Sequence, residues 1–313
     1  MKKGYGIRSL DLFLYNNNEC VLNYLGDPNY EFMYGDIVDP GFIGKVLDGV
    51  ECVIVLSGLV GDPITKKYPE ESALINDQGV KNIIDRCAEL NIDKFIFVST
   101  CSNYGLIESD DLADEEYMLN PLSLYAESKV NAERHILSLK GKTDMHPSIL
   151  RFATAFGLSP RMRFDLTISE FTRDLAMGKE LRVYDANTWR PYCHVQDFAR
   201  LIQMVIEAPK EKVSYEIFNA GGDVNNATKQ MIVDTIIEKI PTGKVRYQKY
   251  GSDPRNYRVN FKKVKSVLGF EPKYTIKDGV EELADLINNH VFDHVDANRN
   301  YFGNYEINYP IPS

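Results

Sequence analysis

Residues 94–105, KFIFVSTCSNYG, combine a short apolar run with a cluster of polar residues at its end. A short apolar run bounded by turn residues is typical of a strand buried on both faces, as in a parallel sheet. Before it, Val80, Ile83 and Cys87 are three and four residues apart, which predicts a helix with one apolar face. A helix followed by a buried strand indicates a repeating strand and helix pattern.

The rest of the first half shows the same alternation. Strands are predicted over 7–11, 32–34, 52–56 and 148–152, and a long helix is predicted over 121–138. Parallel strands need crossover connections, and the helices of these connections cover both faces of the sheet. We therefore expect an α/β fold with a doubly wound, mostly parallel sheet.

The second half has a looser pattern and is expected to form a smaller α+β lobe. Helices are predicted over 166–177, 196–207, 228–239 and 276–289, and strands over 181–184, 215–219 and 244–249. Thr228 is the expected cap of the third helix. We expect one domain over 1–156, with part of 185–215 returning to it, and a second domain mainly over 157–313. No structure is predicted for the tail, NRNYFGNYEINYPIPS.

Composition excludes several classes of protein. The net charge of −9 opposes general binding to nucleic acid or to an anionic membrane, because both need a basic face. No apolar run is long enough to span a bilayer, and no signal peptide is recognisable, so a cytoplasmic protein is expected. The five cysteines form no CxxC pair, so neither a disulfide framework nor a metal site is indicated.

Tyr125 and Lys129 form a candidate catalytic pair in LNPLSLYAESKVNAER, residues 119–134. They are four residues apart on the predicted helix and therefore share one face. A nearby ammonium group favours the phenolate form of a tyrosine and lowers its pKa, which is ordinarily about 10. Such a tyrosine can exchange a proton with a substrate hydroxyl. The same spacing also fits a surface helix with a lysine stem lying along it.

Thr100 lies 25 residues before Tyr125, at the end of the 94–99 strand. This arrangement resembles the extended short-chain dehydrogenase/reductase family, the NAD-dependent nucleotide-sugar epimerases and dehydratases, from about Gly6 to about Leu286. The resemblance implies a Rossmann-like sheet and NAD as cofactor. It also implies that Thr100 hydrogen-bonds the reacting hydroxyl, that Tyr125 is the catalytic tyrosine, and that Lys129 is its partner and contacts the nicotinamide ribose.

The resemblance also implies further cofactor positions. A carboxylate at the end of the second strand accepts the ribose 2′-OH and repels a 2′-phosphate, which favours NAD over NADP. Each of these positions also fits a turn or a helix cap. The implied residues are Asp11 at the adenosine ribose, Asp36 and Ile37 at the adenine, Leu56 and Gly58 beside the pyrophosphate and ribose, and Asn76.

The second half resembles family segments that hold the diphosphate of a nucleotide-sugar. Arg190 and Arg255 are the expected phosphate ligands, because a guanidinium fork fits phosphate oxygens in a bidentate manner. Ser102 is also expected at the substrate, and Arg161 and Arg258 are weaker candidates. His194 precedes a predicted helix and is expected to stabilise a turn.

The family pattern departs from this chain at the first strand. Family members begin with a strand, a GxxGxxG loop and a helix, whose glycines admit the pyrophosphate to the helix N-terminus. Here Lys3 is followed directly by what reads as the end of that helix and the second strand. Three explanations are open: an internal deletion, a sheet that has closed so that the second and fourth strands pair, or another segment or subunit that fills the gap.

The predicted reaction is epimerisation of a nucleotide-diphosphate sugar through a transient keto-sugar. A 4,6-dehydratase of the family carries Asp-Glu after the threonine, whereas this chain has Cys101-Ser102. Cys101 fits either a further acid or base near the sugar or inert packing. The alternatives are a cofactor-less nucleotide-sugar-binding or scaffold protein, or a nucleotide-sugar dehydratase or reductase. A homodimer is expected by resemblance, packed through helices near 73–90 and 121–138 as a four-helix bundle.

Overall fold

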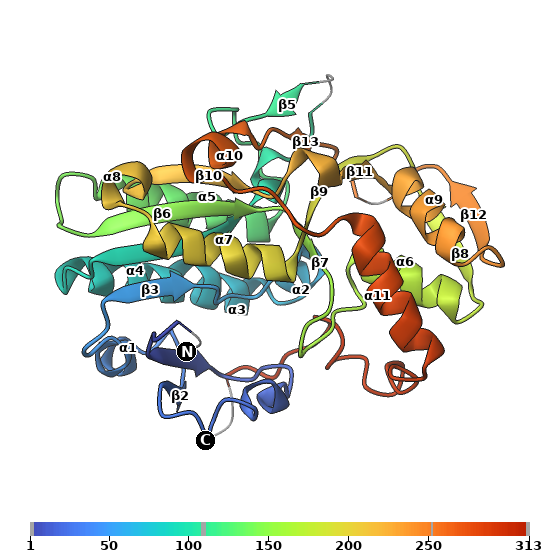
Figure 1. Ribbon diagram of the computed structural model, residues 1–313. Coiled ribbons are helices and arrows are strands. Elements are labelled where there is room, and N and C mark those ends of the chain that lie inside the picture. Colours follow the sequence, from blue (N-terminus) through green and yellow to red (C-terminus); the bar gives the residue numbers. More distant parts are fainter. Residues whose placement is uncertain (1–2, 108–110, 252, 311–313) are drawn as a thin grey trace.

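The computed structural model describes residues 3–107, 111–251 and 253–310. Its centre is a four-stranded parallel sheet with the strand order β10-β6-β4-β3 (Figure 1). The strands are β3 (Cys52–Val55), β4 (Lys94–Thr100), β6 (His146–Phe152) and β10 (Glu216–Ala220). β4 and β6 are almost wholly buried, which accounts for their continuous apolar runs.

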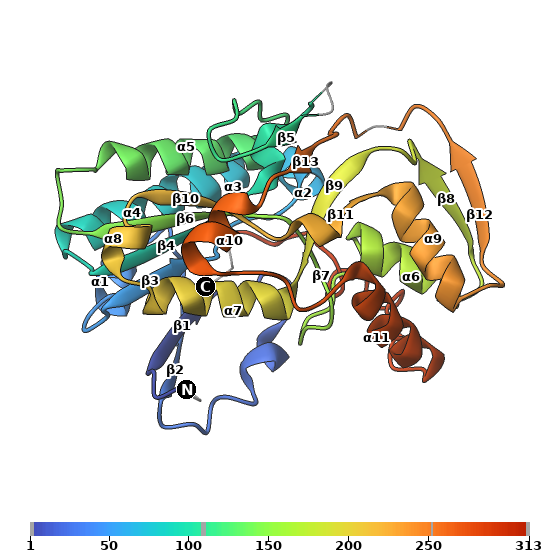
Figure 2. The ribbon, with the colours of Figure 1, turned by 45° about the horizontal axis from the view of Figure 1, so that its top comes forward.

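Helices cover both faces of this sheet. α4 (Val80–Glu89) and α5 (Leu124–Ser138) lie on one side, and α7 (Val195–Glu207) lies on the other (Figure 2). The predicted apolar face of α4 is buried in the core, with Ile84 and Cys87 fully inaccessible. The α/β prediction with a doubly wound, mostly parallel sheet is therefore confirmed.

The first two strands form a separate pair. β1 (Ile7–Asp11) pairs in parallel with β2 (Tyr30–Tyr34), and α1 (Pro40–Val46) comes after them (Figure 1). Within the described residues no strand lies between β1 and β3, and these two strands do not pair. The explanation in which the sheet closes over the gap is therefore wrong.

Arg8 holds the β1-β2 pair against the end of α1. The Arg8 guanidinium donates hydrogen bonds of 2.7 Å to the carbonyl oxygens of Val46 and Asp48, at the end of α1. Arg8 also forms a 2.7 Å ion pair with Glu31 of β2. These contacts anchor β1 to the helix that leads toward β3 and leave its other edge without a strand partner among the described residues.

The second lobe packs three helices against a small parallel sheet. The sheet consists of β8 (Glu180–Tyr184) and β12 (Lys244–Gln248), and the helices are α6 (Thr167–Ala176), α9 (Lys229–Lys239) and α11 (Ile276–Asn288). The Thr228 hydroxyl accepts a hydrogen bond from the Met231 amide, so the predicted cap of α9 is confirmed.

A three-stranded sheet joins the two lobes. Its strands are β7 (Thr154–Phe156), β9 (Trp189–His194) and β11 (Asn226–Thr228). No strand was predicted for β9, although it carries Arg190. After β9 the chain returns to the first lobe as α7 and β10, and the boundary at 156/157 stays a prediction.

Shorter elements complete the described chain. They are η1 (Asn18–Val21), α2 (Asp62–Lys67), α3 (Pro69–Ser72), the π-helical η2 (Ala73–Gly79), η3 (Cys101–Tyr104), β5 (Leu112–Ala113), α8 (Lys210–Val213), η4 (Asp223–Asn225), β13 (Arg258–Val259) and α10 (Lys262–Leu268). β13 pairs with β5, which ties the segment after β12 to the loop beyond η3.

Candidate active site

The three predicted catalytic residues lie together at the carboxyl end of β4. Thr100 ends that strand, and its hydroxyl accepts a 3.1 Å hydrogen bond from the Ser102 amide. Ser123 caps α5 at its N-terminus, and this cap starts the helix two residues before Tyr125. The Thr100 side chain lies near enough to Tyr125 to lower the pKa of the phenol, and the Lys129 ammonium lies 5.9 Å from the centre of the Tyr125 ring.

The electrostatics of Tyr125 differ from the prediction. Burial raises the pKa of Tyr125 to about 12, and the charge of Arg163 and the Thr100 hydrogen bond only partly oppose this rise. The expected lowering by Lys129 is absent because the Lys129 ammonium donates to the Val98 carbonyl oxygen at 2.9 Å. Burial also lowers the pKa of Lys129 to about 8, with Glu133 opposing the shift. In this structure Tyr125 is therefore a neutral phenol at neutral pH.

A buried ion pair connects α5, the helix of Tyr125 and Lys129, to β6. Glu133, one helical turn after Lys129, contacts Arg151 of β6 at 2.7 Å, and both side chains are almost inaccessible. Glu133 also accepts hydrogen bonds from Ser99 at 2.5 Å and Asn103 at 3.0 Å. Neither residue of the ion pair was singled out from the sequence, because charged residues on helices and strands are rarely fully buried.

The two expected phosphate ligands come together through a carboxylate. Arg190 of β9 and Arg255, which precedes β13, both contact Asp253, at 3.1 Å and 2.8 Å. Arg255 also contacts Asp62, the first residue of α2 in the first lobe, at 2.9 Å. Asp62 and Asp253 were missed by sequence reasoning, and their only signal there was a position next to turn residues.

Ser102 lies between the three predicted catalytic residues and the two arginines. Its hydroxyl lies 3.2 Å from the Tyr257 hydroxyl, and the Arg190 guanidinium lies 4.9 Å from the centre of the Tyr257 ring. Cys101 is turned the other way, because its thiol donates to the Arg151 carbonyl oxygen at 3.1 Å. Burial raises the pKa of the Cys101 thiol well above its ordinary value, so the packing interpretation fits better than an acid or base role.

The weaker candidates make structural contacts. Arg258 lies over the Trp189 ring at 4.4 Å, and Arg161 donates hydrogen bonds to carbonyl oxygens of the tail, including Tyr301 at 2.8 Å. His194 is fully buried, and its ring accepts a hydrogen bond from the Gln196 amide at the start of α7. The prediction that His194 stabilises a turn is confirmed.

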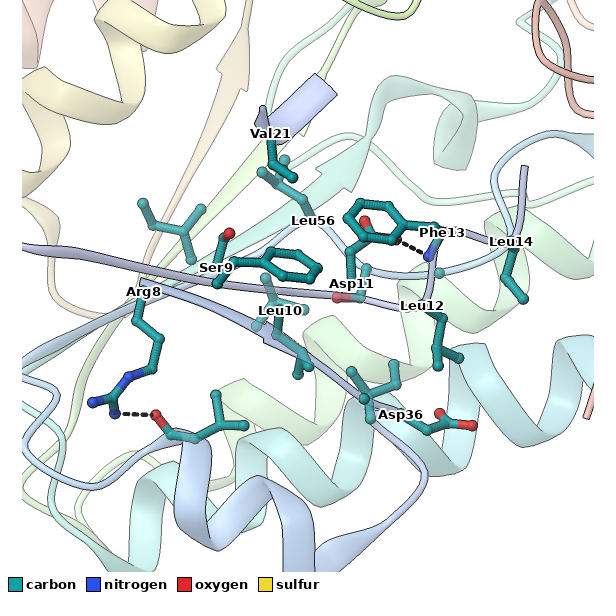
Figure 3. Close-up of a pocket in the computed structure, with 18 of the residues that line it drawn as sticks. Arg8, Ser9, Leu10, Asp11, Leu12, Phe13, Leu14, Val21, Asp36 and Leu56 are labelled. Carbon is teal, nitrogen blue, oxygen red and sulfur yellow. Dashed lines mark hydrogen bonds between the residues drawn. The ribbon is translucent and has the colours of Figure 1, made fainter. Parts of the chain in front are cut away.

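A cavity of about 860 Å³ lies between β1 and β3 (Figure 3). Residues of both strands line it, and most of these side chains are apolar. It extends past the carboxyl ends of the strands to Arg161, Arg163 and Asn304. The predicted cofactor residues that line it are Asp11, Asp36, Ile37, Leu56 and Gly58.

The individual cofactor positions have distinct local roles. Asp11 accepts a 2.7 Å hydrogen bond from the Phe13 amide, and this contact orients its carboxylate at the end of β1 (Figure 3). The Asp36 carboxylate accepts a 2.8 Å hydrogen bond from the hydroxyl of Tyr309, which lies in the tail. Asn76 does not line the cavity; it is buried and holds the loop after β3 by accepting from the Leu59 amide at 2.7 Å.

Several features of the cavity fit a dinucleotide. Gly58 has a φ of 139°, and a Cβ at this position would lie 2.8 Å from the Asn76 side-chain oxygen, so only glycine lets the backbone pass there. The buried Tyr15 hydroxyl has no hydrogen-bond partner among the residues described, and Tyr15 lines the cavity. Two guanidinium groups line one end of the cavity: Arg163 is paired with Asp165 at 2.6 Å, whereas Arg161 donates to carbonyl oxygens of the tail and brings a positive charge.

Comparison with known proteins agrees with this geometry. The model of the NAD dependent epimerase/dehydratase family matches residues 1–221. A low-salt glycan biosynthesis protein, Agl12 of Haloferax volcanii, is 26% identical over 282 residues, which cover 88% of each chain.

Solved structures share the fold. A UDP-glucose 4-epimerase of Thermotoga maritima with UDP-glucose has a TM-score of 0.81 at 21% identity, covering 93% of each chain. A dTDP-glucose 4,6-dehydratase of Streptomyces venezuelae with NAD bound has a TM-score of 0.80 at 22% identity, covering 91% of this chain and 88% of that one.

The fold is that of Rossmann-type nucleotide-sugar epimerases and dehydratases. The chain belongs to the NAD dependent epimerase/dehydratase family, and NAD is the cofactor of that family. In the part of the chain that the structure describes, no helix is long and apolar enough to cross a membrane. The same residues contain no cluster of His, Cys, Asp or Glu that could hold a metal ion.

Proposed function

We propose that this protein is an NAD-dependent epimerase of a nucleotide-diphosphate sugar. The observation that carries the proposal is that Thr100, Tyr125 and Lys129 converge at the end of β4, while Ser102 links them to Arg190 through Tyr257. A sugar at the catalytic residues and a diphosphate at the arginines would then be parts of one ligand. Relatives named UDP-glucuronate 4-epimerase and dTDP-glucose 4,6-dehydratase support this substrate class.

The proposed chemistry begins and ends with a proton at Tyr125. Thr100 holds the reacting oxygen, and Tyr125 removes its proton as the carbon is oxidised to a keto-sugar. When bound, NAD would supply the hydride acceptor and donor, and return of the hydride to the opposite face of the keto-sugar would give the epimer. Tyr125 then returns the proton to the sugar oxygen. The neutral phenol is the protonation state that can donate this proton. Proton removal needs a lower pKa for Tyr125. The Lys129 ammonium lies 5.9 Å from the Tyr125 ring and would have to leave the Val98 carbonyl oxygen to supply that lowering.

Cofactor binding is proposed at the cavity between β1 and β3. Asp11 would accept a hydrogen bond from a hydroxyl of the adenosine ribose, and Asp36 and Ile37 would contact the adenine. Leu56 and Gly58 would lie beside the pyrophosphate and ribose, and Asn76 would act indirectly by holding the Gly58 loop. Lys129 would contact the nicotinamide ribose.

The residues directly after Thr100 favour an epimerase over a dehydratase. A dehydratase needs an additional acid and base to eliminate water, and Cys101 is buried with its thiol on a backbone carbonyl. The carboxylate of Asp62 lies in the surroundings of Tyr125 but is paired with Arg255. A cofactor-less binding protein is the second candidate, because among the described residues the cavity lacks the strand and glycine loop that hold a pyrophosphate in the family.

The test starts with the cofactor. Denaturing the purified protein and identifying any released nucleotide by mass spectrometry, followed by calorimetric titration with NAD, separates the two candidates. Turnover is then assayed by NMR with a panel of UDP- and dTDP-sugars. Epimerisation that Tyr125→Phe lowers about 10²- to 10⁴-fold, with ligand affinity unchanged, supports the proposal. Nucleotide-sugar binding without NAD binding or turnover supports the binding protein.

We also propose a homodimer formed through α4, η2 and α5. Leu74 of η2 and Leu137 of α5 are apolar and exposed on these elements. Light scattering would give a mass twice that of the chain, and a monomer would contradict the proposal.

A further inference from the structure

Asp253 occupies the space between the two arginines that are proposed to hold the diphosphate. One of its carboxylate oxygens accepts from the Arg255 Nε at 2.8 Å, and the other accepts from the Arg255 Nη2 at 2.9 Å and the Arg190 Nη2 at 3.1 Å. This is the bidentate geometry with which a guanidinium group also grips a phosphate. Asp253 therefore takes the contacts that a diphosphate would need.

One further nitrogen of each arginine is also engaged. The Arg255 Nη1 contacts Asp62 at 2.9 Å, and the Arg190 Nη1 donates to the Trp189 carbonyl oxygen at 2.7 Å. The two carboxylates compensate the charges of the two guanidinium groups. Arginines compensated in this way attract a diphosphate only weakly, although both are in place to bind it.

Asp253 is more easily displaced than Asp62. The backbone of Asp62 belongs to the first turn of α2, and its side chain is 28% exposed. Asp253 lies in the connection between β12 and β13, and its side chain is 37% exposed. Water can therefore solvate the Asp253 carboxylate as soon as it leaves the arginines.

The charges around Asp253 favour its ionised form. Burial alone raises the pKa of Asp253, but the Arg255 hydrogen bonds and the charge of Arg190 outweigh burial and hold its pKa well below the ordinary range. Lys229 is a further cation of this cluster: burial, and then the charge of Arg190, lower its pKa. The positive groups are therefore in excess once Asp253 moves away.

We propose that Asp253 is an internal counter-ion, which holds Arg190 and Arg255 in place in the unliganded chain and which the diphosphate of the substrate displaces. This inference rests on the proposed function, because it assumes that a nucleotide diphosphate is the ligand of the two arginines. Asp253 then sets the affinity for the diphosphate, since each binding event must break its contacts.

The test compares Asp253→Asn with the wild type by calorimetry, using UDP, dTDP and inorganic pyrophosphate at two salt concentrations. Asparagine keeps the shape of aspartate and removes the competing charge, so we expect about tenfold tighter binding and a steeper dependence on salt. Asp234→Asn, on the exposed side of α9, is the matched control and leaves the affinity unchanged. Asp253→Ser repeats the test with a smaller side chain.

The outcomes separate this inference from the proposed function. Unchanged or weaker diphosphate binding by Asp253→Asn, in a variant with wild-type thermal unfolding, overturns the counter-ion role. If Asp253→Asn fails to fold, the same comparison is made with Asp253→Ser. Absence of binding to the wild type and to both variants overturns the proposed function as well. Tighter diphosphate binding by Asp253→Asn supports both the counter-ion role and the proposed function if adding Arg190→Gln to that variant abolishes the binding.

Discussion

The Lys129 ammonium donates a 2.9 Å hydrogen bond to the carbonyl oxygen of Val98 and lies 5.9 Å from the centre of the Tyr125 ring. The lysine is thereby buried against β4 without a directly bonded carboxylate, and this burial lowers its pKa from 10.5 to about 8. Burial of an ammonium group costs free energy of folding, and strongly shifted pKa values are enriched at functional sites.

Replacing Lys129 with methionine should stabilise the protein at pH 7. The unfolded lysine binds its proton more tightly than the folded one, so stability rises with pH between about 8 and 10.5 and is lowest below this window. At about 1.36 kcal/mol per pKa unit, the cost at pH 7 is on the order of 3 kcal/mol. We expect Lys129→Met to raise the free energy of unfolding by about 1–3 kcal/mol and to abolish turnover.

Urea unfolding at pH 7 and pH 10 would measure this effect. The exposed Lys277, paired only loosely with Glu281, provides the control Lys277→Met, which should leave the stability unchanged at both pH values. A loss of stability in Lys129→Met at pH 7 would show that the Val98 contact outweighs the cost of burial.

Removing Arg151 should destabilise the protein strongly. Arg151→Met leaves the buried Glu133 carboxylate without its 2.7 Å ion-pair partner, and breaking a buried pair in this way costs about 3–5 kcal/mol. Chemical denaturation measures the loss. The exposed pair of Arg86 and Glu89 offers the control Arg86→Met, for which we expect less than about 1 kcal/mol.

The double variant Glu133→Leu with Arg151→Met should recover part of that stability, because it removes both buried charges. If Arg151→Met alone costs less than about 1 kcal/mol, the ion pair is hydrated in solution and the buried network does not support α5.

The β1-β2 pair should exchange its amide hydrogens faster than the main sheet. Among the described residues β1 has a strand partner on one side only, whereas β4 and β6 each lie between two strands. Few strand contacts give a low free energy of local opening. Hydrogen exchange with mass spectrometry should show rapid labelling of 7–11 and slow labelling of 94–100. Equal protection of the two segments would mean that another chain fills the cavity beside β1.

Tyr309 should compete with the cofactor for Asp36. Its hydroxyl donates a 2.8 Å hydrogen bond to the Asp36 carboxylate, which is the predicted adenine contact. Tyr309→Phe frees this oxygen and keeps the ring, so we expect about three- to tenfold tighter NAD binding by calorimetry. Tyr305→Phe serves as the control, since no contact to Asp36 is known for Tyr305 within the described residues. Weaker binding in Tyr309→Phe would show instead that the hydroxyl contacts the cofactor.

Much of the fold could be predicted because its signals are local. The apolar run of 94–99 and the spacing of Val80, Ile83 and Cys87 each lie within a few residues, and both elements formed as expected. β9 was missed because Arg190 and the proline after it interrupt any alternating pattern in its sequence, WRPYCH. The tail was left unassigned because its sequence shows no period typical of a helix or a strand.

The sequence by itself determined the strand and helix order and brought Tyr125 and Lys129 to one helix face, because periodicity and spacing act within a single element. Only the tertiary structure decided the separation of β1 from β3, the high pKa of Tyr125, and the Asp62, Arg255 and Asp253 contacts. These features depend on burial and on charges that meet from segments up to 193 residues apart, such as Asp62 and Arg255 (255 − 62 = 193), and no local pattern encodes such distances.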